Sequence, residues 1–118
     1  MKIVKKKKRI NSKDKGKRGE RMFAAYLNEN CKHADARRGQ QFQGGPESPV
    51  VVSSLPYHFE VKFRENLNVH KAMEQARKEA PPEKTPNVQW KKSREDWLTI
   101  LLTDDFLKIV NRKDTAAC

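Results

Sequence analysis

Apolar and polar residues alternate most regularly over residues 57–63 of the chain. Successive side chains of a strand point to opposite faces, so this alternation predicts a β-strand with two unlike faces. The apolar face carries Phe59, Val61 and Phe63, and the charged face carries His58, Glu60, Lys62 and Arg64. We expect the apolar face to pack against the core and the charged face to be exposed.

A helical pattern precedes this strand, over residues 13–30. Residues three and four apart share one face of a helix, and here that face carries Glu20, Phe23, Ala24 and Leu27. Ser12 or Asp14 can cap its start. The helix is therefore expected to direct the Glu20 carboxylate toward the core.

A second helix is predicted over residues 68–80. Its apolar positions, again at helical spacing, are Val69, Ala72, Met73 and Ala76. Asn68 can cap its start, and Pro81 with Pro82 ends it. This helix directly follows the alternating strand, so the two form a strand-helix unit.

Shorter patterns predict the remaining elements. Residues 39–49 read as a short strand followed by a loop, residues 50–53 as another short strand, and residues 87–91 and 96–102 as two strands joined by a charged turn. Thr103 can cap a last helix over residues 104–110. The order of helix, three strands, helix, two strands and helix predicts an α+β fold in which helices flank a central mixed five-stranded sheet.

The length of 118 residues suits one domain with one modest core. The net charge is +11, and the first twenty residues supply +8 of it, with ten basic and two acidic residues. We expect a flexible basic arm at 1–12, one folded domain at 13–111 and a tail at 112–118. Such an excess of positive charge favours a polyanionic partner, for which nucleic acid is the first candidate.

No apolar stretch approaches the roughly 18 to 20 residues that span a membrane, and the first residues lack the apolar centre of a signal peptide. The sequence therefore predicts a soluble, cytoplasmic protein without a membrane partner. Its two cysteines are too few and too far apart in sequence for a disulfide framework or a thiolate metal site. We therefore expect them to be reduced, with Cys31 as a small buried residue.

Glu60 and Lys62 are the strongest candidates for chemistry. Side chains two apart on a strand lie roughly 6.5 to 7 Å apart on one face, so both can reach one small ligand. Phosphodiester hydrolysis uses such a pair, a carboxylate for a divalent cation and an ammonium for the developing negative charge. Two readings stay open here, because a Glu-x-Lys triplet also occurs as a simple ion pair on solvated strands. His58 shares this face, as a base or as a structural residue.

Several motifs follow one another in a definite order. They are the Gly16 to Glu20 segment that opens the first helix, Arg37-Arg38, the Gly-Gly-Pro-Glu-Ser-Pro loop at 44–49, Phe59-Glu60-Val61-Lys62, and Gln75 on the second helix. This order resembles the restriction-endonuclease-like PD-(D/E)XK nucleases, and among them the small phage and archaeal Holliday-junction resolvases. The resemblance covers about residues 15–106.

The resemblance implies a phage-type, structure-specific DNA endonuclease, a hydrolase of DNA recombination that requires Mg²⁺ or Mn²⁺. It makes Glu20 and Glu60 metal ligands, Lys62 the catalytic lysine and Gln75 a polar residue beside the active site. It further implies a homodimer on a four-way junction, in the cytoplasm of the host cell. The basic residues expected to contact DNA, from the resemblance and from the charge of the arm, are Lys5, Lys6, Lys7, Lys8, Arg9, Lys17, Arg18, Arg37, Arg38 and Arg64.

One position departs from the family pattern. The family places an Asp after the Pro that opens the second strand, whereas Pro49 is followed here by Val50. Either Val50 is an inactivating change, or Glu47 substitutes from the loop, or the resemblance is misplaced at this point. The alternatives to a junction resolvase are a non-enzymatic basic nucleic-acid-binding protein and a nuclease that acts on non-junction duplex DNA.

Overall fold

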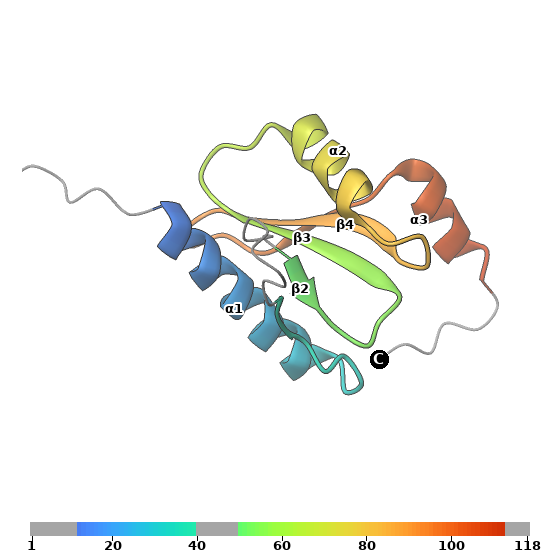
Figure 1. Cartoon of the computed structure of the whole chain (residues 1–118), viewed down its shortest axis with the longest axis horizontal. Helices are drawn as coiled ribbons and strands as arrows, with labels where there is room; N and C mark the ends of the chain where they lie inside the picture. Colours follow the sequence, from blue (N-terminus) through green and yellow to red (C-terminus); the bar gives the residue numbers. More distant parts are fainter. Residues whose placement is uncertain (1–11, 40–49, 113–118) are drawn as a thin grey trace, which may run out of the picture.

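The computed structural model describes residues 12–39 and 50–112, and Figure 1 shows their arrangement. In chain order the elements are α1 (Ser12–Asn30), β1 (Arg37–Arg38), β2 (Val50–Val52), β3 (Tyr57–Phe63), α2 (Val69–Glu79), β4 (Thr85–Lys91), β5 (Leu98–Ile100) and α3 (Thr103–Val110). The predicted order of elements is confirmed. The predicted α+β class with a mixed five-stranded sheet is confirmed as well.

Some sequence predictions fall on residues that lie outside this description. They concern the basic arm with Lys5, Lys6, Lys7, Lys8 and Arg9, the loop with Glu47, and all of the tail except Arg112. The arm and the tail therefore stay predictions.

The sheet places β3 between β2 and β4. Its order is β1-β2-β3-β4-β5, in which β3 and β4 run parallel and every other neighbouring pair is antiparallel. Two parallel strands need a crossover connection between them, and α2 forms that connection. The strand that carries Glu60 and Lys62 thus has a strand on each side and a helix directly after it in the chain.

Helix α1 covers the face of the sheet that carries the apolar side chains of β3. Phe23 packs against Phe59, with their ring centroids 5.2 Å apart, and against Trp97 at 5.1 Å. Gly19 lets the helix approach β3 closely, because a Cβ at this position would lie 2.6 Å from the Cβ of Phe63. Cys31 is buried in the same cluster, as predicted, but it is disulfide-bonded and not reduced as expected.

Helix α2 covers the opposite face, and the two helices lie on either side of the sheet in Figure 1. Its apolar residues Ala72, Met73 and Ala76 are buried against Val88 of β4. The predicted cap is confirmed, since the Asn68 side chain accepts a hydrogen bond from the Lys71 backbone N–H. Packing on Val88 holds α2 across the polar face of β3.

The structure corrects several local predictions. The strand predicted at 87–91 begins two residues earlier, at Thr85. The short strand expected to begin at Gly39 is formed two residues earlier, by Arg37 and Arg38, because these residues pair with β2. The strand predicted at 96–102 is shorter and spans 98–100 only. Thr103 does not cap α3, because the N-cap position is occupied by Leu102, which makes no side-chain cap hydrogen bond.

Candidate metal site

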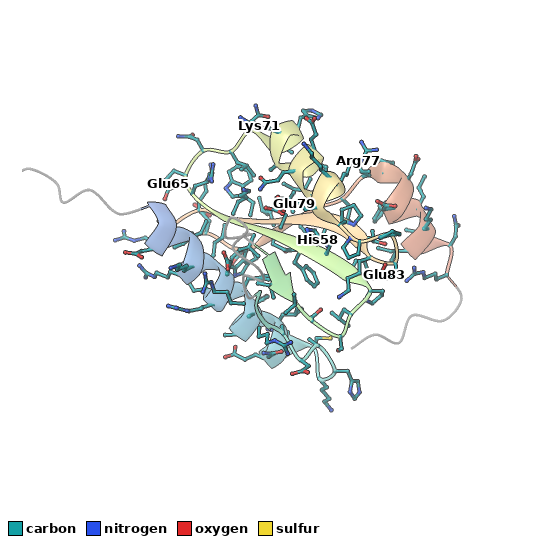
Figure 2. All side chains as sticks on the ribbon, viewed as in Figure 1. His58, Glu65, Lys71, Arg77, Glu79 and Glu83 are labelled. Carbon is teal, nitrogen blue, oxygen red and sulfur yellow. The ribbon has the colours of Figure 1, made fainter. Side chains whose placement is uncertain are left out.

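The charged face of β3 is buried and not exposed, which corrects the expectation from the alternating pattern. His58 and Glu60 are 7% and 0% exposed, and the side chain of Lys62 is 11% exposed. The reason lies in the parallel crossover, which lays α2 over this face. Figure 2 shows His58 on β3 and Glu79 on the overlying helix. A strand that alternates in polarity is thus covered on both faces.

Glu60 is the centre of this buried group. Its two carboxylate oxygens have no hydrogen-bond partner, and the same holds for Nε2 of His58. His58 Nε2 lies 3.6 Å from Oε1, and Lys62 Nζ lies 3.7 Å from Oε2, both beyond hydrogen-bonding distance. Burial raises the pKa of Glu60 above its ordinary value, and the nearby Glu79 carboxylate adds to this rise. Such a site favours an added positive charge.

Glu79 of α2 completes a set of possible metal ligands. One ligand atom from each of His58, Glu60 and Glu79 lies within 4.8 Å of the others. Two carboxylates at this distance repel each other unless a proton or a cation lies between them. The buried acceptors without partners and the two facing acids therefore fit a divalent cation.

Gln75 connects Lys62 to this group. Lys62 Nζ donates a hydrogen bond to Gln75 Oε1 at 3.1 Å, and Gln75 Nε2 donates one to Glu79 Oε1 at 3.4 Å. Burial lowers the pKa of Lys62, and the Glu60 carboxylate opposes this effect. The ammonium is thus held beside Glu60 by a neutral partner. Gln75 and Glu79 also line an open hollow on the surface of α2, so solvent reaches this end of the group.

Position 50 lies directly opposite Glu60 in the sheet. The antiparallel register of β2 and β3 pairs Val50 with Glu60 and Val51 with Phe59. Residues directly opposite each other in an antiparallel pair share a face of the sheet. By this register, position 50 belongs to the same face of the sheet as Glu60.

Glu20 has a different environment. It is 3% exposed and accepts a hydrogen bond from Nε of Arg38 at 2.9 Å. Its helix, α1, packs on the sheet face that carries Phe59 and Val61, opposite to the Glu60 side chain. Glu20 is buried as predicted, but it does not join Glu60 in the group of possible ligands among the described residues. Its role as a metal ligand stays a prediction.

The basic residues expected to contact DNA lie in two places. Arg37 is exposed on β1, whereas Arg38 forms an ion pair with Glu20. At the end of β3, Arg18 lies over the Phe63 ring at 5.9 Å, Lys15 at 4.9 Å and Lys91 at 5.7 Å. We call these three cations the Phe63 cluster. Arg64 next to it is exposed, and Lys17 is half-buried on α1.

Sequence reasoning missed Glu79 as a neighbour of Glu60, and it did not place Lys15 and Lys91 together beside Phe63. For Glu79 one signal was present, because it follows Gln75 by four residues and so lies on the same side of the helix. No comparable signal joined Lys15 to Lys91, which are 76 positions apart in the sequence. Only the packing of α1 against the end of β3 brings them together.

Comparison of the chain with protein-family models, with curated proteins and with solved structures found no match. Among residues 12–39 and 50–112, no helix is both long enough and apolar enough to cross a membrane.

Proposed function

We propose that this protein is a metal-dependent DNA endonuclease of the PD-(D/E)XK type, with its site on the face of β3 that α2 covers. The observation that carries the proposal is the buried Glu60, whose two oxygens lack hydrogen-bond partners while Lys62 is held 3.7 Å away. A buried carboxylate without partners is costly, and such groups cluster at functional sites. The order of sequence motifs supports the same family.

Each residue of the site has a role in this proposal. Glu60 holds a divalent ion, and the ion, when bound, polarises the scissile phosphate and lowers the pKa of a water molecule. Lys62 faces the same phosphate and stabilises the negative charge that develops on it. Gln75 keeps the Lys62 ammonium in position through its hydrogen bond.

DNA is the proposed substrate, with a four-way junction as the leading form. The Phe63 cluster supports this, because its cations gather at the end of β3, on the sheet face opposite to Lys62, where they can contact a phosphate backbone that passes the end of the strand. Unbranched or nicked duplex DNA is the alternative substrate. A protein that binds nucleic acid without cutting it is the alternative function, in which Glu60 and Lys62 form only an ion pair.

Replacing Lys62 with alanine tests the catalytic assignment. We expect Mn²⁺-dependent cutting of a labelled four-way junction to fall at least about a hundredfold, because the charge that stabilises the transition state is lost. DNA binding should change by less than about twofold, since one partly buried lysine adds little to phosphate contacts. Gel-based cleavage and fluorescence anisotropy measure the two effects.

The matched control is Lys71→Ala, which removes an exposed lysine of α2. Equal cutting by the natural chain and the Lys62→Ala variant would contradict the assignment. A natural chain that binds DNA but cuts neither branched nor linear forms would favour the non-enzymatic alternative, unless Asp at position 50 restores cutting.

A homodimer belongs to the same proposal. Four large apolar side chains near the end of the described chain are about half exposed or more, and they are Leu98, Phe106, Leu107 and Val110. Three of them share one face of α3, because they recur at helical spacing. Pairing with a second copy would remove this face from water, and two copies present two sites to symmetric strands.

Replacing Phe106 with glutamate is expected to convert a dimer into a monomer, because a charge cannot be buried in an apolar contact without a partner. Light scattering after size exclusion should then report a mass near the 13.7 kDa of one chain and not twice that value. Lys108→Glu adds the same side chain at a position of α3 that is 76% exposed, and should leave the dimer intact. A monomeric natural chain would contradict this part of the proposal.

A further inference from the structure

We infer that His58, Glu60 and Glu79 together bind one divalent transition-metal ion, and that His58 makes this site prefer Mn²⁺ and Zn²⁺ over Mg²⁺. The inference deepens the proposed nuclease function, since it names the ligands and the class of the ion. Two of the three ligands, His58 and Glu79, have no place in the sequence motif that suggested a nuclease.

The first step is the convergence of the three side chains. His58 and Glu60 are two apart on β3 and share a face of the strand, and Glu79 reaches them from the last turn of α2. Their ligand atoms lie within 4.8 Å of one another. Two ligands on opposite sides of an ion with bonds of about 2.1 Å are about 4.2 Å apart, so only a small inward movement is needed. Glu79 is exposed and can make it.

The second step is the state of these atoms without an ion. A cluster of acids on a surface is common, but here the His58 and Glu60 side chains are 8% and 0% exposed, and the atoms facing Glu79 have no hydrogen bond. Lys62 places one positive charge 3.7 Å from Glu60 Oε2, outside hydrogen-bonding distance, and this single charge faces a group with two carboxylates. A bound cation satisfies Glu60 and His58 at once and removes the repulsion between the acids.

The third step is the type of ligand, which selects the ion. Carboxylates suit Mg²⁺ and Mn²⁺, whereas an imidazole nitrogen suits the later transition metals. A site of one imidazole and two carboxylates therefore ranks Zn²⁺ above Mn²⁺ and Mn²⁺ above Mg²⁺. Valine at position 50 also favours Zn²⁺ and Mn²⁺ over Mg²⁺. Because this position supplies no aspartate oxygen, metal binding depends more on the nitrogen of His58.

Calorimetric titration of the metal-free full chain with Zn²⁺, Mn²⁺ and Mg²⁺, in separate experiments without DNA, tests the inference. We expect one ion per chain with affinity in the order Zn²⁺, Mn²⁺, Mg²⁺. His58→Gln should weaken Zn²⁺ and Mn²⁺ binding at least about tenfold but change Mg²⁺ binding much less. Glu79→Gln should weaken binding of all three ions. The paramagnetic resonance spectrum of Mn²⁺ gives a second readout that does not depend on heat.

The chain offers matched controls on the same helix. His70→Gln and Glu74→Gln remove exposed groups of the same types from α2, outside the ligand group, and should leave the affinities within about twofold. Circular dichroism checks folding of the His58→Gln variant, whose side chain is buried. If that variant does not fold, the exposed Glu79→Gln variant decides the inference alone.

Three outcomes would overturn the inference. One is a natural chain that binds none of the ions, another is tighter binding of Mg²⁺ than of Mn²⁺, and the third is unchanged binding in Glu79→Gln. If Glu60→Gln and Glu20→Gln lose the ion while the His58 and Glu79 variants keep it, the ligand set inferred here fails but the proposed nuclease stands. If the inferred ligands hold the ion but neither the natural chain nor Val50→Asp cuts DNA, the proposed function fails and the metal site stands.

Discussion

Replacing Val50 with aspartate is expected to raise metal-dependent DNA cleavage about ten- to a hundredfold, the range by which supporting groups alter metal affinity or activity. The physical reason is the register of β2 and β3, which places position 50 directly opposite Glu60. Residues opposite each other in an antiparallel pair have Cβ atoms about 4.5 to 5.5 Å apart on one face. An aspartate there adds a third carboxylate beside Glu60, and Mg²⁺ depends on such charged oxygen ligands.

The variant should also change the preference among ions. With a third carboxylate at the site, the affinity for Mg²⁺ should rise more than the affinity for Zn²⁺, because Mg²⁺ favours oxygen ligands and Zn²⁺ accepts nitrogen as readily. We therefore expect Val50→Asp to narrow the gap between Mn²⁺- and Mg²⁺-supported cutting. Initial cleavage rates on a four-way junction, a nicked duplex and a linear duplex, each with both ions, measure this.

Val50→Asn is the matched control, since it has the shape of aspartate without the charge and should leave cleavage at the level of the natural chain. Adding Lys62→Ala to Val50→Asp should abolish the gain. A folded Val50→Asp protein that binds Mn²⁺ and DNA but cuts none of the three substrates would contradict the proposed function.

Replacing Glu60 with glutamine should stabilise the metal-free protein by roughly 1 to 3 kcal/mol and abolish its stabilisation by metal. A buried acceptor without a partner costs about this much, and more when it is charged. Glu60 is fully buried, and neither of its oxygens has a hydrogen bond. Glutamine keeps the shape, removes the charge and adds a donor that can face Glu79. Urea unfolding in EDTA measures the difference.

The pH dependence of this difference follows from the pKa of Glu60, which burial raises above its ordinary value of 4.5. The folded protein then holds the proton more tightly than the unfolded chain does. The stability of the natural chain relative to the variant therefore falls as the pH rises from about 4.5 through the folded-state pKa. The advantage of Glu60→Gln should be small below pH 4.5 and complete above the folded-state pKa.

Added metal should make the natural chain more stable than the Glu60→Gln variant, which is the reverse of the order expected in EDTA. At a hundred times its dissociation constant, an ion that binds only the folded protein adds about 2.7 kcal/mol to the stability. The natural chain should gain this from Mn²⁺, and Glu60→Gln should gain little. Glu74→Gln, at an exposed position of α2, should remain within about 0.5 kcal/mol of the natural chain under both conditions. A Glu60→Gln protein less stable than the natural chain in EDTA at neutral pH would contradict the cost assigned to this carboxylate.

Much of the candidate site was predictable because it depends on local geometry. The spacing of Glu60 and Lys62 on one strand places them on one face, and Gln75 lies on the helix that directly follows. The structure brings these three residues together, with Lys62 between the carboxylate and the amide. Glu79 was not predicted, because its contact with Glu60 depends on how α2 crosses the sheet.

Periodicity also gave the wrong exposure for β3. An alternating strand is typical of a sheet with one solvated face, yet His58 and Glu60 are buried. The pattern reports which side chains share a face, and it contains no information about what covers that face. In this protein Ala72, Met73 and Ala76 pack on Val88 of the neighbouring strand, and this packing draws α2 over the polar residues of β3.

By itself the sequence determined the order of the elements, the two faces of β3 and the buried position of Glu20, because these follow from the periods of strands and helices and from local stop signals. The tertiary structure alone decided that Glu60 faces Glu79 and that Glu20 pairs with Arg38. It also decided that Val50 lies opposite Glu60. These relations depend on strand register and on helix packing between distant segments, which side-chain spacing within one segment does not encode.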